Sequence, residues 1–360
     1  MNILWLMIIS IIVALSQGLI YAAAGLRGLE YSRSFSSETA HEGDKIEMVE
    51  VIRNRKPLPL PWVRVESRIH PSLRFTGALG EERAIEADQY HRSIFFLGPY
   101  QQVTRRHEVT CGRRGFYRVG SAEITAGDLF AFSHRSKSVS LDCGLTVYPG
   151  LLSEGEADFP SSRWQGGLAI KRWIMPDLFL IDGLREYRAG DPPRDIHWRA
   201  TARSGHLQVK VRGYTVDPRA LVVLNTQKSE DQWGELMEYE REGIERGIRA
   251  AATLCMKALA AGSETGFASN ACLAGDKGNG RTVYVPSRRS FDQAEQILTA
   301  MAAMLIHREV TFNTLLDGLY ERIQDTDIVI FTMYVSSALT RCIEKLRAKG
   351  NSVTLVSMRI

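Results

Sequence analysis

The residue types best suited to chemistry gather in residues 185–210, in the stretch REYRAGDPPRDIHWRATARSGHLQVK. Carboxylates and histidines lie close together here, so Asp191 with His197, or Asp195 with His206, forms a candidate acid–base pair. The same stretch is dense in arginine, whose planar guanidinium binds carboxylates or phosphates through two parallel hydrogen bonds. This composition fits either an active site or a binding site in which arginines hold carboxylates or phosphates.

A hydrolase is the catalytic interpretation, and Ser204 beside His206 adds a potential nucleophile. Catalytic triads are defined by spatial geometry, however, and adjacency in the sequence does not supply it. The chain also lacks GxSxG, HExxH and GxxxxGK(S/T) sequences and a glycine-rich dinucleotide loop. We therefore expect no enzyme activity, and keep a hydrolase that uses acid–base residues of this stretch as the alternative.

The same residue types can instead build a rigid joint. A Gly-Asp pair suits a tight turn in which the carboxylate accepts hydrogen bonds from turn amides or from arginine. Arginine also stacks on aromatic rings. The residues expected to take part are Arg185, Tyr187, Gly190, Asp191, Arg194, Trp198 and Arg203. We expect them to lock two domains or two chain segments together; because arginine and aromatic residues are enriched at interfaces, partner docking is the rival role.

The first 26 residues predict a transmembrane helix. No charged side chain occurs from Asn2 to Leu26, and about 20 such residues span the hydrocarbon core of a bilayer. A cleaved signal peptide competes with this interpretation, but the positive segment that should precede its apolar run is missing. Arg27 and Arg33 are the first cations, so the positive-inside rule places the bulk of the chain in the cytoplasm. We expect a single-pass protein of the cell membrane.

Charge and cysteine content argue against several other classes of protein. A net charge of +4 on 360 residues is slight, and no nucleic-acid partner is expected. The five cysteines are widely spaced and never form a CxxC pair, so a zinc site or a disulfide framework is not indicated. Buried free thiols in a reducing compartment are the simpler expectation.

Residues 29–150 predict an antiparallel β-sandwich-like domain. In the run WVRVESRI, Val63, Val65 and Ile69 alternate with charged residues, which is the pattern of a half-buried strand. Glycine- and proline-rich turn signals separate several such runs. Short alternating strands at this spacing are typical of a sandwich.

Residues 216–360 predict an α/β domain with a mostly parallel sheet covered on both faces. Helical patterns run from 244 to 259, from a Ser290 cap to Leu305, from 313 to 323 and from a Ser336–Ser337 cap to Gly350. The segment 151–215 joins the two halves and contains Trp164 and Trp173, which are unusual in a flexible linker. The fold class is therefore α+β multidomain.

The central stretch resembles the hallmark of domain-of-unknown-function family 58, a spaced pattern R-x-Y-x-x-G-D-x-x-R-x-I-x-W-x-x-x-A-R. Further motifs, GRRGFYRVGSAEITAGDLFAFSHR, LTVYPG and RNRKPLPLPWVRVE, are similar to strands and turns of that family. The resemblance implies a β-sandwich-like region joined to a von Willebrand factor A-like, Rossmann-like domain. It also implies bacterial or archaeal members that accompany MoxR-type AAA+ ATPases.

The resemblance also raises the question of a metal-dependent adhesion site, whose motif is D-x-S-x-S after the first strand. The corresponding positions here are Asn225, Gln227 and Ser229, with Thr314 or Thr311 as the later threonine. Both expected aspartates are absent, and neutral oxygens alone dehydrate Mg²⁺ poorly. We therefore expect a degenerate site without metal or other cofactor, and keep a metal-dependent protein-binding module as a second alternative.

These observations predict a non-enzymatic, membrane-anchored scaffold or adaptor that assembles a protein complex. By resemblance, its expected partners are a MoxR-type AAA+ ATPase and other membrane proteins. The expected order along the chain is a transmembrane helix (1–26), a β-sandwich-like domain (29–150), the signature segment (151–215) and the von Willebrand factor A-like domain (216–360).

Overall fold

The structure, a computed structural model, describes residues 3–76, 89–129, 134–153, 176–188, 191, 193–214, 219–231, 236–274 and 278–358. It divides into two compact units, Met1–Gly150 and Leu151–Ile360. Trp164, Trp173 and Gly190 lie outside the described residues. The whole is a mixed α+β protein with an N-terminal apolar helix and several sheets.

Helix α1 (Ile3–Ala24) continues through Ser16, Gln17 and Gly18, so the polar residues in its middle do not interrupt it. Its segment Trp5–Ala24 is long and apolar enough to cross a membrane, and most of its large side chains are exposed. The helix ends where the ammonium of Lys56 donates hydrogen bonds to the carbonyls of Ala24, Gly25 and Arg27. A cation at this position complements the negative end of the helix dipole.

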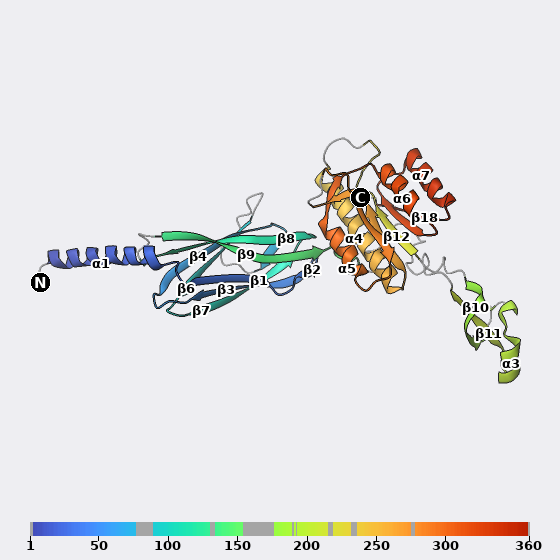
Figure 1. Ribbon diagram of the computed structural model, residues 1–360, viewed down its shortest axis with the longest axis horizontal. Helices are drawn as coiled ribbons and strands as arrows, with labels where there is room; N and C mark the ends of the chain where they lie inside the picture. The colour runs from blue at the N-terminus through green and yellow to red at the C-terminus, as the bar shows by residue number, and fades with distance from the viewer. Residues whose placement is uncertain are drawn as a thin grey trace. The chain divides into compact units, whose positions relative to one another are not determined.

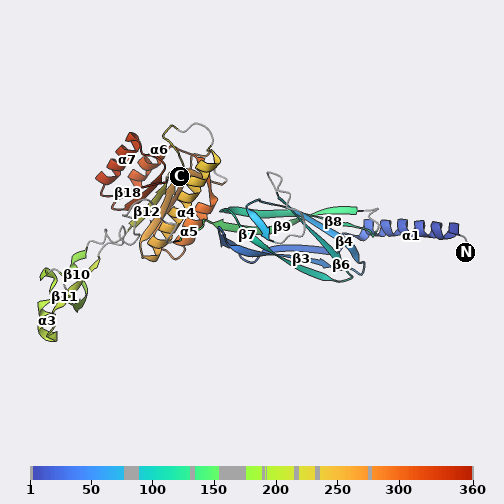
Figure 2. The ribbon, with the colours of Figure 1, turned by 180° about the vertical axis from the view of Figure 1, so that it is seen from behind.

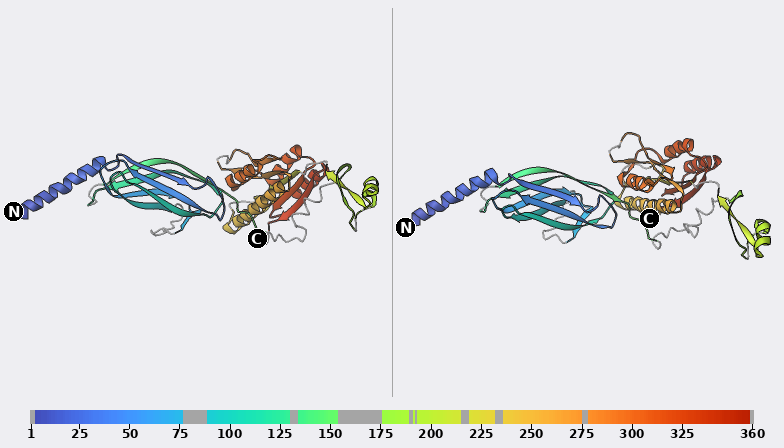
Figure 3. Two further views of the ribbon diagram at one scale, coloured as in Figure 1. Left: turned by 90° about the horizontal axis from the view of Figure 1, so that it is seen from below. Right: turned by 60° about the horizontal axis from the view of Figure 1, so that its bottom comes forward.

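Two sheets face each other in the first unit (Figure 1; Figure 3 shows them from two further sides). One sheet has the order β1-β3-β7-β5, with strands Leu29–Phe35, Lys45–Asn54, Gln102–Cys111 and Leu73–Thr76. The other has the order β2-β9-β8-β4-β6, with strands Thr39–His41, His134–Tyr148, Gly115–Gly127, Leu60–Ile69 and Gln89–Leu97. All neighbouring strands are antiparallel except β2 and β9, which are parallel.

One apolar core fills the space between these sheets. Val63, Val65 and Ile69 of β4 are buried, as the alternation in the sequence predicts. They join Met48, Val109 and other residues of the opposite sheet in a single cluster. Side chains of alternate residues in a strand point to opposite faces, so each strand gives one face to this core and one to its surroundings.

The second unit contains a five-stranded sheet in the order β15-β13-β12-β17-β18. Its strands are β12 (Arg219–Leu224), β13 (Glu264–Ser269), β15 (Val283–Arg288), β17 (Asp327–Thr332) and β18 (Ser352–Ser357). All pairs are parallel except β13 with the edge strand β15, which is antiparallel. The unit also has a short antiparallel pair, β14 (Ala271–Leu273) with β16 (Met304–Arg308).

Helices cover both faces of this sheet: α4 (Glu238–Ala260), α5 (Gln293–Ala303), α6 (Phe312–Arg322) and α7 (Ser337–Ala348) (Figures 1 and 2). Leu221 and Val223 of β12 share a core with α6 and α7. Leu224 on the other face packs near Gly247 of α4. The alternation of side chains along β12 therefore supplies two separate cores.

Helix α5 departs from the sequence prediction. It begins after Asp292 rather than Ser290 and ends at Ala303, and Leu305 lies in β16. Met304 takes an extended conformation and pairs with Leu273 of β14. The apolar spacing of three and four continues through Leu305, so periodicity alone does not reveal that strand pairing ends the helix.

All five cysteines, Cys111, Cys143, Cys255, Cys272 and Cys342, are buried and free. Burial raises the pKa of the thiol of Cys111 to about 11. Thiols in such surroundings stay protonated and unreactive.

Candidate functional site

The signature stretch forms a hairpin in which β10 (Pro176–Glu186) pairs with β11 (Gln208–Tyr214). Between the strands, the chain makes a short 3₁₀ turn, Pro193–Asp195, and the helix α3, Trp198–Ser204. Ile196 is buried and bridges to Val209 of β11. We call residues 183–210 the signature hairpin.

Arg185 and Asp191 form a two-pronged clamp inside the signature hairpin. Both terminal nitrogens of Arg185 donate to the two carboxylate oxygens of Asp191 at 2.7 Å each. The backbone amide of Arg188 adds a third hydrogen bond at 2.8 Å. The Arg185 guanidinium, helped by the Arg188 amide, lowers the pKa of Asp191 to about 2. Both carboxylate oxygens are thus engaged in closing the loop that follows β10.

The histidines and the serine of the stretch have local structural contacts. His197 is the N-cap of α3, and its Nδ1 accepts a hydrogen bond from the amide of Ala200 at 3.0 Å. The hydroxyl of Ser204 donates to the carbonyl of His206 at 3.0 Å, not to its ring. The carboxylate of Asp191 binds Arg185 rather than His197, so the first of the two predicted acid–base pairs is not formed.

The outer surface of the signature hairpin is cationic and aromatic. Helix α3 has no buried residue, and Trp198 is 68% exposed. Arg199 and Arg203 are exposed as well, and Tyr187 is partly exposed. Neither ring stacks on an arginine in the described part of the chain, so the predicted cation–π contacts are not formed there. The side chain of Arg194 lies outside the described residues.

The sequence-predicted metal positions lie where β12, β13 and β17 end, and they meet Asn270, which sequence reasoning missed. Asn225 donates from Nδ2 to the hydroxyl of Thr332 at 3.1 Å, and its Oδ1 accepts from the amide of Gln227 at 2.9 Å. Oδ1 of Asn270 accepts from both the amide and the hydroxyl of Thr226. All five side chains are almost completely buried. We call this set the amide network.

The amide network extends to the start of α6 but does not include the side chains of the two other predicted ligands, Ser229 and Thr314. Oε1 of Gln227 accepts from the amide of Phe312 at 2.7 Å and from Nδ2 of Asn270 at 3.2 Å. Ser229 contributes a backbone carbonyl rather than its hydroxyl. Thr314 is exposed, and its hydroxyl bonds to that of Thr311. The amide oxygens face internal donors, and the set has no carboxylate to compensate the charge of Mg²⁺.

A third polar cluster lies in the core of the first unit and was not foreseen from the sequence. Glu50 of β3 is fully buried, and its carboxylate pairs with Arg33 of β1 at 2.5 Å. The hydroxyls of Tyr31 and Ser93 donate to it at 2.6 and 2.7 Å. Because Ser93 comes from the other sheet, the carboxylate joins the two sheets through their interior.

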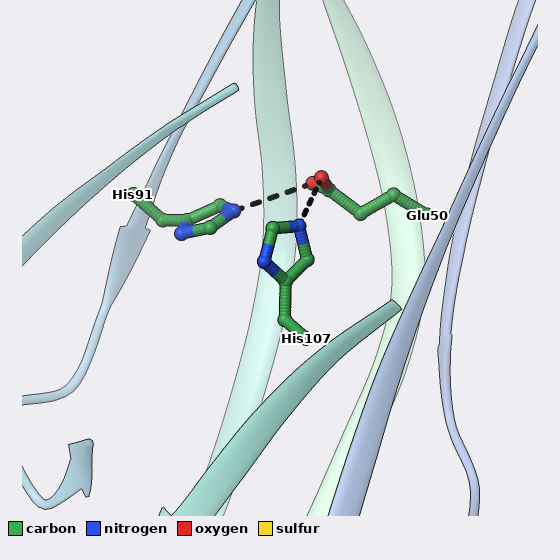
Figure 4. A group of neighbouring side chains, drawn as sticks. All are labelled: Glu50, His91 and His107. Atoms are coloured by element: carbon green, nitrogen blue, oxygen red, sulfur yellow. Dashed lines mark hydrogen bonds and ion pairs between the residues drawn. The ribbon is translucent and has the colours of Figure 1, made fainter. Parts of the chain in front are cut away.

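Two histidines aim their Nε2 atoms at the same carboxylate (Figure 4). His107 of β7 lies 3.0 Å from Oε2 of Glu50, and His91 of β6 lies 3.6 Å from Oε1. Burial raises the pKa of Glu50, but hydrogen bonds from His107 and His91 and the charge of Arg33 outweigh it, so the pKa is lowered overall. Burial lowers the pKa of His91 against the opposing attraction of Glu50.

Glu50, His91 and His107 offer ligand atoms within 4.8 Å of one another, the set that holds zinc in some enzymes. Both oxygens of Glu50 are already engaged, however, with two hydroxyls, a histidine and the guanidinium of Arg33. A divalent cation here would stand beside Arg33 with a single carboxylate to compensate both charges, which burial makes costly. The arrangement fits an internal ion-pair network better than a metal centre.

The second unit, which contains the signature hairpin, is similar in sequence to known proteins. Residues 183–359 match the model of the family described as Protein of unknown function DUF58. The DUF58 match begins in β10 and covers the signature hairpin and most of the second unit, but not its residues 151–182. The motifs RNRKPLPLPWVRVE and LTVYPG lie outside the matched range.

Individual relatives and solved structures add little. The uncharacterized protein YeaD of Bacillus subtilis (strain 168) is 21% identical over 186 residues, which cover 51% of this chain and 44% of YeaD. The chain thus spans less than half the length of this relative.

Among solved structures, the CARDB domain of the PF1109 protein from Pyrococcus furiosus, crystallised with di-metal ions, is 14% identical, with a TM-score of 0.19 over 32% of this chain and 90% of that one. A non-cellulosomal cohesin from Archaeoglobus fulgidus is 14% identical, with a TM-score of 0.21 over 36% and 95%. At such TM-scores neither informs fold or function.

Proposed function

We propose that this protein is a non-enzymatic, single-pass membrane scaffold of the DUF58 family that docks a protein partner on the exposed face of its signature hairpin. The observation that carries the proposal is that two groups of residues in this short segment have different surroundings. Arg185 and Asp191 bind each other in the clamp. Trp198, Arg199 and Arg203, in contrast, are exposed on α3 and have no described side-chain contact. Exposed tryptophan and arginine are the residue types most enriched at binding hot spots.

The contacts of the polar residues support a role without catalysis. A general base works best when its pKa lies near the working pH, whereas Arg185 lowers the pKa of Asp191 to about 2. His197 uses Nδ1 to cap a helix, and Ser204 donates to a carbonyl. These three candidate residues of the hydrolase alternative are therefore engaged in folding the hairpin.

The second unit supports an assignment to the von Willebrand factor A-like class. Numbered along the chain, its strands lie in the order 3-2-1-4-5, the order of doubly wound folds that bind ligands where the strand order reverses. The amide network lies at that point, between the ends of β12 and β17. We propose that it is a metal-free remnant of an adhesion site, in which amide-to-amide hydrogen bonds replace the cation.

The positive charge of the signature hairpin favours a partner with an acidic surface. Arginines on α3 favour an acidic surface, with an apolar recess for Trp198. The family resemblance makes a MoxR-type AAA+ ATPase our proposed partner. Exposed positive residues that follow α1, such as Arg27 and Arg53, favour a cytoplasmic location for both units, where such an ATPase works.

Crosslinking in native membranes followed by mass spectrometry tests this proposal. The full-length chain is compared with a Trp198→Ala, Arg203→Glu double variant. The matched control is Phe291→Ala, Arg341→Glu, since Phe291 is completely exposed and Arg341 is exposed on α7. We expect the wild type and the control to crosslink to an AAA+ ATPase and the hairpin variant to lose that crosslink. Unchanged crosslinking by the hairpin variant, or no ATPase with the wild type, would contradict the proposal.

A further inference from the structure

We propose that the end of the sandwich nearest α1 is a second membrane contact, which inserts side chains into the interface of an anionic phospholipid bilayer. This inference rests on the proposed role of α1 as a membrane anchor. The surface consists of residues 59–61, 96–101 and 128–129, which we call the rim patch. It borders an open hollow of about 490 Å³ that is lined by Tyr21 of α1 together with Pro59, Leu60, Pro61, Phe96, Leu97, Gly98, Gln101 and Leu129.

The rim patch exposes large apolar and aromatic side chains. Phe96 is 72% exposed, Tyr100 68% and Leu129 65%. These side chains line or adjoin the same hollow, so they form a contiguous surface rather than scattered residues. Aromatic residues of this kind are enriched where a membrane protein crosses from hydrocarbon to water.

Contacts attach the rim patch to α1 inside its apolar span. The hydroxyl of Tyr21 donates a hydrogen bond to the carbonyl of Pro59 at 3.0 Å. A Cβ added at Gly18 would lie 3.9 Å from Oδ2 of Asp128. Both helix positions belong to the Trp5–Ala24 segment that is suited to cross the membrane. The rim patch therefore reaches the level of residues that the bilayer has to enclose.

The length of the apolar span favours insertion. Trp5–Ala24 rises about 30 Å at 1.5 Å per residue, which matches the thickness of the hydrocarbon core. When this span crosses the bilayer, Gly18 and Tyr21 lie in its last turns, next to the interface. The rim patch that contacts these two residues is carried to the same level. The exposed side chains of Phe96 and Leu129 are apolar, as that depth requires.

Charges beside the rim patch match anionic headgroups. Arg27 and Arg53 are exposed, and Lys56 lies at the end of α1. Glu30, an exposed acid that follows α1, is paired with Arg55 at 2.9 Å. A cationic collar around an apolar surface is drawn to the negatively charged inner leaflet. Because the rim patch contacts the Trp5–Ala24 span, these features favour a lipid surface over a protein partner.

Fluorescent labelling of single cysteines tests the contact in vesicles of phosphatidylcholine and phosphatidylglycerol. Because the native cysteines are buried, an environment-sensitive dye is attached to Phe96→Cys or Leu129→Cys in the full-length chain. The control is Phe116→Cys, which is 51% exposed on the same strand as Gly127 but about 36 Å along it. Unchanged melting temperatures confirm that each labelled variant is folded.

We expect blue-shifted emission at positions 96 and 129, and loss of most of the fluorescence when lipids carry a doxyl quencher near the headgroup. Position 116 should show neither effect. Unquenched, red-shifted dye at both rim positions, in protein that still floats with the vesicles, would overturn the rim contact and leave the anchor intact. Protein that fails to float with the vesicles at all would overturn the anchor, and the rim contact with it.

Discussion

At the scale of single residues, the most consequential group is the buried carboxylate of Glu50. It balances the charge of Arg33 and accepts hydrogen bonds from strands of both sheets. Replacing such a pair with apolar residues is often neutral, but removing one partner leaves an uncompensated charge in the core. The sandwich therefore depends on the pair being complete.

Glu50→Gln should destabilise the sandwich by roughly 3–5 kcal/mol, because it keeps the shape of the side chain but leaves the Arg33 guanidinium buried without a counter-charge. Hydrogen exchange of β3 and β7 amides measures the loss as a lower opening free energy. Asp142→Asn breaks an ion pair with Arg118 whose side chains are 95% and 75% exposed, and it should cost less than about 1 kcal/mol. Equal effects of the two changes would contradict this role of Glu50.

Acidification should also weaken the sandwich. The pKa of His91 is lowered by burial from its usual 6.5, so the unfolded chain binds more protons below that pH than the folded chain does. The stabilisation is therefore present above pH 6.5 and is lost as the pH falls through the folded pKa. Among the charged groups around the ring, Glu50 favours its protonated form, whereas Arg33 and His107 oppose it.

The pH dependence is measured as the opening free energy of β6 amides between pH 7.5 and 5.5. The opening free energy should fall as the pH is lowered in the wild type, and it should fall less in His91→Gln. The exposed His134 provides the comparison, because His134→Gln should leave the slope unchanged. If both substitutions give the wild-type slope, another group causes any acid sensitivity.

At the scale of elements, the clamp of Arg185 and Asp191 holds the signature hairpin. Asp191→Asn removes the charge that attracts the guanidinium and one of the acceptors of its two hydrogen bonds. We expect faster hydrogen exchange in β10 and β11. The nearby Glu186→Gln changes an exposed carboxylate in the same hairpin and should leave exchange unaltered. Protection that survives Asp191→Asn would show that the strand pairing alone maintains the hairpin.

Substitution of alanine for two glycines in the second unit should change its stability in opposite directions, because one site is crowded and the other is open. A Cβ at Gly266 of β13 would meet the backbone nitrogen of Ser287 and the carbonyl of Val285 at 2.7 Å, where the pairing with β15 is irregular. Gly266→Ala should therefore destabilise this unit by about 1–3 kcal/mol. Gly318→Ala, on α6 with open space around it, should stabilise by about 0.5–1 kcal/mol. Thermal unfolding of both variants checks the opposite signs.

The elements were largely predictable because periodicity and caps are local signals. The alternation around Val63 and the Ser336 cap both predict what the structure contains. The end of α5 was not predictable, since pairing of Met304 depends on a partner about thirty residues away. The cluster of Glu50, His91 and His107 escaped for the same reason: its members come from three strands far apart in the sequence, and each alone resembles an ordinary charged strand residue.

At the scale of the whole molecule, the proposed membrane anchor leads to a prediction about the side of the membrane on which the second unit lies. Phe291→Cys adds a completely exposed thiol to a chain whose own cysteines are buried. A cytoplasmic second unit predicts no labelling by a membrane-impermeant maleimide in intact cells and strong labelling after permeabilisation. The unsubstituted chain provides the background. Labelling of intact cells would place this unit outside.

In the proposed membrane orientation, the attachment of α1 through Lys56 and Tyr21 would make the sandwich a spacer of fixed length between the bilayer and the chain that follows. Gly127 of β8 pairs with His134, and Gly115 at the other end of the strand pairs with Val147. The chain therefore leaves the sandwich, after Tyr148, about 40 Å from the rim patch. Electrostatic screening at physiological salt acts over about 8 Å. With the rim patch at the bilayer as proposed, this exit point would lie beyond the screening distance of the lipid headgroups.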